Sequence, residues 1–217
     1  MNEKSWRLRK LTVMAMLVAL SFVSVALVRI PVVLFLNYEP KDVFLTVGSF
    51  IFGPVAGIGM AVVVALLELV TVSTTGVIGL IMNIVSSGLF VGVSSLIYHK
   101  KRTLLGAVIG LACGVLCMTA GMVLWNYLIT PLYMDVPRDV VAGMLLTTFV
   151  PFNLLKGAIN ATLTMVLYKG VTSALRSARL LPPASSSGQK SSFPVLPVAL
   201  FVLTSLVLVL LLWGGII

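Results

Sequence analysis

Long apolar runs without charge alternate with short charged segments along this chain. A helix needs about 20 apolar residues to cross the hydrocarbon core of a bilayer, which is about 30 Å thick. Five stretches meet this length: 11–29, 78–98, 104–129, 141–168 and 194–214. Because the runs are continuous and do not alternate with a period of two, they predict transmembrane helices rather than the strands of a barrel.

A further apolar stretch, 43–72, is interrupted at Gly53 and Pro54. Proline lacks an amide donor and breaks a helix, and glycine tolerates a turn. We therefore predict two helices here, 43–52 and 55–72. Ten helical residues reach only about 15 Å, so the first of the two can lie at membrane depth only if protein or a cavity covers its ends.

The basic residues indicate the topology. Eleven of the 15 lie in three segments: 1–10, 98–103 and 169–193. Short cytoplasmic loops are enriched in Lys and Arg, and a turn at Gly53-Pro54 places all three segments on the cytoplasmic side. The predicted order is a cytoplasmic basic tail, a six-helix membrane domain, a cytoplasmic linker and an accessory transmembrane helix: 1–10, 11–175, 176–193 and 194–217.

Composition agrees with this pattern. Hydrophobic residues make up 59% of the 217 residues and charged residues only 10%, against about 25% charged in soluble domains. A soluble globular protein and a disordered chain are both excluded, and the fold class is an all-α integral membrane protein. The net charge of +9 lies in the loops and indicates topology, not nucleic-acid binding. A cleaved signal peptide over the first 26 residues is the alternative for the N-terminus, but apolar sequence continues to Leu36.

The sequence holds no motif of a known catalytic or metal site. It contains neither a G-x-x-x-x-G-K-[ST] phosphate-binding loop nor an H-E-x-x-H zinc motif. Its single histidine, His99, stands beside three cations. The two cysteines, Cys113 and Cys117, are four residues apart on one predicted helix, which is a poor geometry for a disulfide. We expect no enzyme activity, no metal and no cofactor.

Polar residues inside the predicted spans are the candidates for function. Lys156 lies near the middle of the last helix of the six-helix domain and shares one helical face with Asn153, Asn160 and Thr164. A charge at the bilayer centre costs about 2.5–3.5 kcal/mol on insertion scales, so it normally faces a cavity or a partner. Helix–helix hydrogen bonding explains Asn160 and Thr164. For Asn153 and Lys156 we expect a role in binding a ligand or ion.

Other polar groups leave alternatives open. Glu68 is the only acid within a predicted span, and it either pairs with Lys156 or Arg29 as a structural ion pair or belongs to a site. Two amides, Asn83 and Asn126, lie in other spans. The aromatic neighbours of Asn126 are Trp125 and Tyr127, a combination that suits a flat, hydrogen-bonding heterocycle.

Two shorter features complete the candidate set. The outer loop 37–42 is either a solvated turn or part of a site, and its candidate residues are Tyr38, Glu39, Lys41 and Asp42. Ala15 and Ala19 form a small-xxx-small face on the first helix, and such faces allow another helix to approach closely.

Four segments resemble the riboflavin-binding S components of energy-coupling factor (ECF) transporters. They are KDVFLTVGSFIFGPVAG (41–57), GLIMNIVSS (79–87), WNYLITPLYMDVPRD (125–139) and PFNLLKGAIN (151–160). The resemblance covers about residues 8–175, and the last two segments are the more specific. The helix at 194–214 departs from the family pattern.

The resemblance implies a six-helix subunit in the plasma membrane of a prokaryote, with a cytoplasmic N-terminus, that binds riboflavin in an outward-facing cavity. Such a subunit hydrolyses no ATP. It relies on a module of two ATPases and a membrane-embedded coupling protein, on which it docks partly through the face of Ala15 and Ala19. The matching flavin-binding positions are Asn126, Asn153 and Lys156, and the first outer loop, around Tyr38 to Asp42, acts as a lid.

Three alternatives remain open from the sequence. The ligand could be another vitamin or a flavin phosphate, which the charge of Lys156 would suit. The chain could be a secondary transporter driven by an ion through Glu68. It could also be a membrane scaffold without a ligand.

Overall fold

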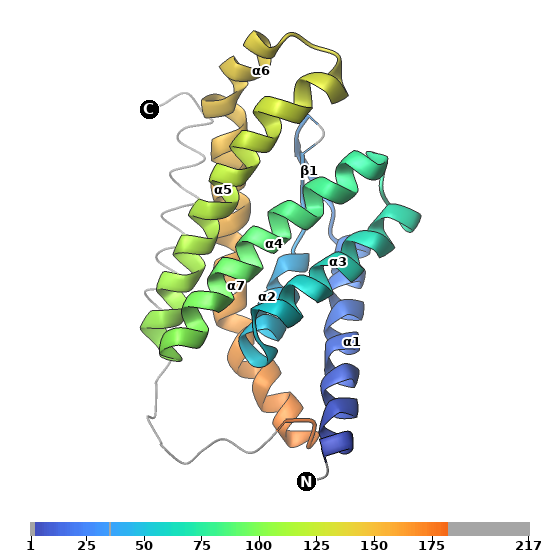
Figure 1. The fold of residues 1–217 in the computed structure, drawn as a ribbon, viewed down its shortest axis with the longest axis vertical. Helices are drawn as coiled ribbons and strands as arrows, with labels where there is room; N and C mark the ends of the chain where they lie inside the picture. The colour runs from blue at the N-terminus through green and yellow to red at the C-terminus, as the bar shows by residue number, and fades with distance from the viewer. Residues whose placement is uncertain (1–2, 35, 182–217) are drawn as a thin grey trace.

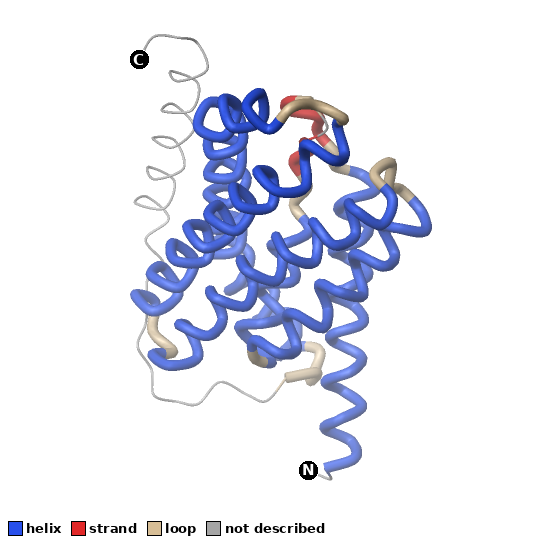
Figure 2. Tube along the Cα trace, turned by 45° about the horizontal axis from the view of Figure 1, so that its top comes forward, coloured by secondary structure: helices blue, strands red, loops and turns tan. Residues whose placement is uncertain are grey.

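The structure is a computed structural model that describes residues 3–34 and 36–181. Figures 1 and 2 show helices packed side by side, with a short antiparallel hairpin at the end away from the N-terminus. The elements are α1 (Glu3–Leu27), β1 (Ile30–Val33), β2 (Leu36–Tyr38), α2 (Lys41–Phe52), α3 (Pro54–Thr71), α4 (Gly76–Lys101), α5 (Leu104–Met134), α6 (Arg138–Met144), a π-helical turn (Leu145–Phe149) and α7 (Val150–Ser177).

Within the described residues, five helices are long and apolar enough to cross a membrane. They are α1, α3, α4, α5 and the continuous 40-residue helix Arg138–Ser177, which joins α6 to α7 through the π turn. The prediction of a multi-pass helical membrane protein is therefore confirmed. The 12 residues of α2 are too few to span a bilayer. The predicted accessory helix at 194–214 lies outside the described residues.

The predicted break between α2 and α3 is confirmed. α2 ends at Phe52, and Pro54 occupies the first turn of α3, where a missing amide donor costs no hydrogen bond. Gly53 between them has a φ of 102°, a conformation that side chains with a Cβ rarely adopt. Most of α2 is buried, as expected for a helix too short to span the membrane.

The observed elements differ from the predicted ones mainly at the ends of helices and in the hairpin. α1 begins at Glu3, because a run of charges marks where the membrane ends and not where the helix ends. α5 continues through Pro131 to Met134, since a proline one turn from the end removes only one hydrogen bond. The hairpin was not predicted: its strands, Ile30–Val33 and Leu36–Tyr38, are too short and too apolar to distinguish from a helix end.

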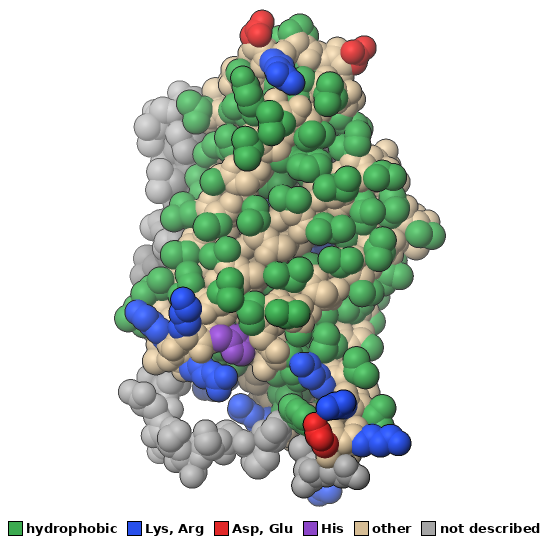
Figure 3. Space-filling view, viewed as in Figure 1, with side chains coloured by type: hydrophobic (Ala, Val, Ile, Leu, Met, Phe, Trp, Pro, Cys, Tyr) green, Lys and Arg blue, Asp and Glu red, His purple; other side chains and the backbone are tan. Residues whose placement is uncertain are grey.

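The two ends of the molecule differ in their content of basic side chains. Lys and Arg side chains gather at the end that holds the N-terminus and the α4–α5 turn, which we call the basic end (Figure 3). The opposite end, called the hairpin end, holds the hairpin and α6 (Figure 1). There, a small apolar cluster packs β2 against the π turn and its neighbours through Leu36, Val141, Phe149 and Phe152.

Glycines let α4 and α5 approach each other closely. A Cβ added at Gly110 would lie 2.6 Å from the carbonyl oxygen of Ser94, and one added at Gly114 would lie 2.8 Å from that of Phe90. Both distances are shorter than atoms tolerate, and a backbone oxygen cannot move away as a side chain can. The tight packing of these two long helices therefore depends on glycine at both positions.

Gly110→Ala should lower the stability of the protein by about 1–3 kcal/mol, because the added methyl group forces α4 and α5 apart. Gly88→Ala on α4 is the matched control, since a Cβ there meets nothing within 4 Å. Thermal unfolding in detergent measures both variants. Equal melting temperatures for the two would contradict this account of the α4–α5 contact.

Candidate functional site

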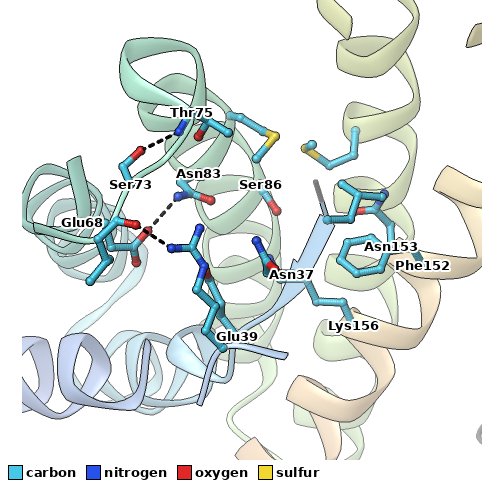
Figure 4. Close-up of a pocket in the computed structure, with 15 residues that line it drawn as sticks. Asn37, Glu39, Glu68, Ser73, Thr75, Asn83, Ser86, Phe152, Asn153 and Lys156 are labelled. Carbon is cyan, nitrogen blue, oxygen red and sulfur yellow. Dashed lines mark hydrogen bonds and ion pairs between the residues drawn. The ribbon is translucent and has the colours of Figure 1, made fainter. Parts of the chain in front are cut away.

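A cavity opens at the hairpin end between the hairpin, α3, α4, α5 and α7. The space between its walls, counted together with its open mouth, is about 630 Å³. Figure 4 shows polar side chains converging on it from several elements. Those that the following argument uses are Asn37, Glu39, Glu68, Asn83, Asn153 and Lys156.

Lys156 is a buried ammonium group that no carboxylate of residues 3–34 and 36–181 contacts directly. Its side chain is only 7% exposed and extends from α7 toward Asn37 (Figure 4). Within the described part of the chain it makes no hydrogen bond and no ion pair shorter than 4 Å. A buried charge in this state is costly unless something else meets it. Lys156 is therefore poised to donate hydrogen bonds into the cavity.

Asn153 lies one turn before Lys156 on the same face of α7 and also lines the cavity. Its amide nitrogen donates to the carbonyl oxygen of Phe149 at 2.8 Å. This bond leaves the side-chain oxygen of Asn153 available as an acceptor. The preceding π turn, in which the Val150 amide bonds to the Leu145 carbonyl, sets the rotation of α7 that brings both residues to the cavity.

Glu68 pairs with Lys41. The two ion-pair partners considered from the sequence, Lys156 and Arg29, are therefore wrong, and the other alternative, that Glu68 belongs to a site, stays a prediction. The Lys41 ammonium lies 2.8 and 2.7 Å from the two carboxylate oxygens of Glu68, and both side chains are buried. Asn83 donates to the same carboxylate at 2.7 Å. Lys41 is close enough because α2 begins deep inside the bundle, which a pattern read along the chain does not show.

Further ion pairs connect Lys41 to residues that line the cavity. Lys41 also lies 3.0 Å from Glu39, and the second oxygen of Glu39 lies 3.3 Å from Nε of Arg29. Arg29 in turn donates to the carbonyl oxygen of Val72 at 2.6 Å. The four side chains Arg29, Glu39, Lys41 and Glu68 thus form a continuous chain of ion pairs.

Glu39 is ionised in this arrangement. Burial alone would raise the pKa of Glu39, but the positive charges of Lys41, Lys156 and Arg29 outweigh burial and lower the pKa.

Asp42 joins the start of α2 to two other helices. It accepts hydrogen bonds from Ser87 of α4 at 2.5 Å and from Asn160 of α7 at 3.4 Å. The Tyr38 hydroxyl donates to the side-chain oxygen of Asn160 at 3.1 Å, which fixes the end of β2 to α7. Burial and the charge of Asp42 raise the pKa of Tyr38 to about 12, so that its hydroxyl stays protonated and can donate.

The structure brings some of the candidate residues to the cavity and places others elsewhere. Glu39, Glu68, Asn83, Asn153 and Lys156 line it. Lys41, Asp42 and Tyr38 do not line it. Lys41 holds Glu39 and Glu68, which do, whereas Asp42 and Tyr38 bond to Asn160 behind the cavity wall.

Asn126 and its aromatic neighbours do not line this cavity. The Asn126 amide donates to the Met122 carbonyl at 2.7 Å and accepts from the Thr130 hydroxyl at 2.8 Å, so both ends are used within α5. Trp125 lines a smaller cavity between α4 and α5, and Tyr127 is exposed.

Sequence reasoning missed several residues of the cavity wall. Arg29, Asn37, Ser73 and Thr75 all line it. They stand outside the predicted spans or at their edges, where polar residues are ordinary. Asn37 belongs to the loop 37–42 and Arg29 was considered only as an ion-pair partner of Glu68, so these two carried some signal, whereas Ser73 and Thr75 carried none.

Comparisons with known proteins decide the family. A sequence model described as "ECF transporter, substrate-specific component" matches residues 9–168. The chain belongs to this family. It is thus a substrate-specific, or S, component of a transporter and not an enzyme. This family membership supports neither the ion-driven secondary transporter nor the scaffold without a ligand.

Individual relatives agree. This S component is 30% identical over 178 residues to the riboflavin transporter RibU of Streptococcus thermophilus, covering 77% of this chain and 84% of that one. It is 27% identical to the riboflavin transporter FmnP of Bacillus subtilis, covering 75% and 91%. A solved structure described as the S component of a bacterial ECF transporter matches with a TM-score of 0.66 and 28% identity, covering 78% of this chain and 99% of that one.

Lys41→Met should destabilise this S component by about 3–5 kcal/mol, because it leaves the buried carboxylate of Glu68 without a counter-charge. The double variant Lys41→Met/Glu68→Gln should recover much of that loss. Thermal unfolding of both variants measures the difference.

Arg7→Met is the control for this test. It breaks the exposed Arg7–Glu3 pair, whose atoms lie 2.9 Å apart, and should change stability by less than about 1 kcal/mol. An equal loss in the single and double variants at Lys41 and Glu68 would contradict a stabilising role for this ion pair.

Proposed function

We propose that this S component binds riboflavin in the cavity at the hairpin end and supplies it for ATP-driven uptake. Relatives 27–30% identical to this chain are named riboflavin transporters. The four sequence segments that resemble the riboflavin group include the one that carries Asn153 and Lys156. Both of these residues line the cavity.

One observation carries the proposal: a hydrogen-bond donor and a hydrogen-bond acceptor, neither used by another described residue, lie next to each other on α7. Lys156 offers an ammonium group, and Asn153, whose nitrogen is bonded to Phe149, offers an oxygen. The pyrimidine edge of a flavin alternates carbonyl oxygens with an imide N–H. An acceptor and a donor three residues apart on one helix face can meet that edge.

The rest of the cavity suits the remaining parts of riboflavin. Phe152, Met82 and Met122 supply apolar and polarisable wall for the ring system. Toward the α3–α4 connection the wall becomes polar, with Ser73, Thr75 and other side chains able to bond the hydroxyls of the ribityl tail (Figure 4). We place the ring near α7 and the tail near this connection. Asn126 can contribute only if it exchanges its bonds to Met122 and Thr130 for the ligand.

We place the hairpin end outside the cell and the basic end in the cytoplasm. Lys and Arg gather at the basic end, which is the pattern of cytoplasmic loops. The N-terminus then lies in the cytoplasm of a prokaryotic cell, and the cavity opens outward. The hairpin, which lines the cavity through Leu36 and Asn37, is positioned to act as its lid, and the buried ion pairs of Glu39 and Lys41 form the fixed base on which it is mounted.

We propose that the S component docks through α1 onto an energy-coupling module of a membrane-embedded coupling protein and two ATPase subunits. Ala15 and Ala19 are both exposed on α1, one turn apart, whereas Val13 and Leu17 on the opposite face are buried. A stripe of small exposed residues lets the backbone of another helix approach closely.

Lys156→Met should weaken riboflavin binding at least about tenfold, because it removes a charged donor from a buried site. Lys169→Met, an exposed position on the same helix, should bind like the wild type. Quenching of flavin fluorescence by the purified protein measures both. Wild-type affinity in Lys156→Met would overturn the site.

Ala15→Trp should leave riboflavin binding unchanged and reduce uptake into cells or vesicles that contain the coupling module. The indole would hold the docking helix away from α1. Leu116→Trp is the control, because Leu116 is exposed on α5. Normal uptake by Ala15→Trp in a fully assembled complex would contradict docking through this face.

A further inference from the structure

We propose that Glu39 makes the cavity selective for an uncharged ligand, by neutralising Arg29 and so excluding riboflavin that carries a phosphate on its tail. This inference rests on the proposed function. It adds a residue that discriminates between two closely related ligands.

Arg29 stands where a phosphate would arrive. It lines the cavity together with Val72, Ser73 and Thr75, at the end where we place the ribityl tail. A guanidinium group is a common partner for phosphate in proteins, because its fork of donors matches the phosphate oxygens. Taken alone, Arg29 and the nearby hydroxyls would favour a phosphorylated ligand.

Two of the three guanidinium nitrogens of Arg29, and its charge, are already engaged. Nε lies 3.3 Å from Glu39, and Nη1 donates to the Val72 carbonyl at 2.6 Å. Glu39 is 6% exposed and lines the same cavity, so a phosphate beside Arg29 would face a carboxylate at close range. Like charges at a partly buried site repel strongly because water screens them little.

The charges around the cavity add up to zero. The cations are Arg29, Lys41 and Lys156, and the acids are Glu39, Asp42 and Glu68. Glu39 is the member that contacts two of these cations directly, and its lowered pKa reflects Lys156 as well. A neutral ligand preserves this balance, and a phosphate dianion does not. Replacing Glu39 by glutamine leaves a net charge of +1 and frees the guanidinium.

Three probes test the inference on the wild-type protein: riboflavin, riboflavin 5′-phosphate and riboflavin 5′-acetate. The acetate ester enlarges the tail without adding charge, so it separates a steric exclusion from an electrostatic one. We expect the phosphate to bind at least about tenfold more weakly than riboflavin and the acetate to bind within about threefold of it. Equal binding of riboflavin and its phosphate, or equal weakening by phosphate and acetate, would overturn the inference.

Variants then identify the residue. Glu39→Gln should narrow the ratio of phosphate to riboflavin dissociation constants about tenfold, and Arg29→Gln/Glu39→Gln should restore it. Glu3→Gln, on the exposed start of α1, changes the net charge equally and should leave the ratio unchanged. An unchanged ratio in folded Glu39→Gln would overturn the assignment.

Two further outcomes are also decisive. If Glu39→Gln does not fold, Glu39→Asp retains the charge and should retain the selectivity, and loss of selectivity there would overturn the electrostatic account. If wild-type protein binds none of the three flavins, the proposed function itself fails, and this result differs from one in which riboflavin and its phosphate bind equally.

Discussion

The buried ion pair between Lys41 and Glu68 is the constraint on which the rest of the hairpin end depends. It lies where the first residues of α2 meet α3, and Asn83 of α4 completes the contacts of the carboxylate. Because two charges buried without each other are far more costly than the pair, α2 cannot move away from α3 without a large penalty. The short, buried helix α2 is thereby fixed at a definite depth.

That fixed depth determines the geometry of the cavity. Glu39 stands two residues before Lys41 and shares its ammonium, so the strand that ends at Tyr38 is held at the cavity wall. Asp42 extends the same junction to α4 and α7. One turn of α2 therefore positions residues from the hairpin and from α3, α4 and α7, and the wall opposite Lys156 is a consequence of where α2 begins.

How much could be predicted from the sequence depended on whether the signal was local. The break at Gly53-Pro54 and the shared face of Asn153 and Lys156 follow from backbone chemistry and helical period, and both appear in the structure. The partner of Glu68 depends on how helices far apart in sequence pack together, and there the prediction was wrong. The hairpin carries only short apolar runs, whose period does not separate a strand from a helix end.

The π turn at Leu145–Phe149 has a consequence for how this segment can vary in length. Each residue of a helix turns it by about 100°, so adding or deleting a single residue between Arg138 and Asn153 would rotate Asn153 and Lys156 away from the cavity together. The one extra residue that the π turn accommodates thus determines which face of α7 points toward the cavity. Insertions here would be tolerated only in numbers that return the helix to the same face.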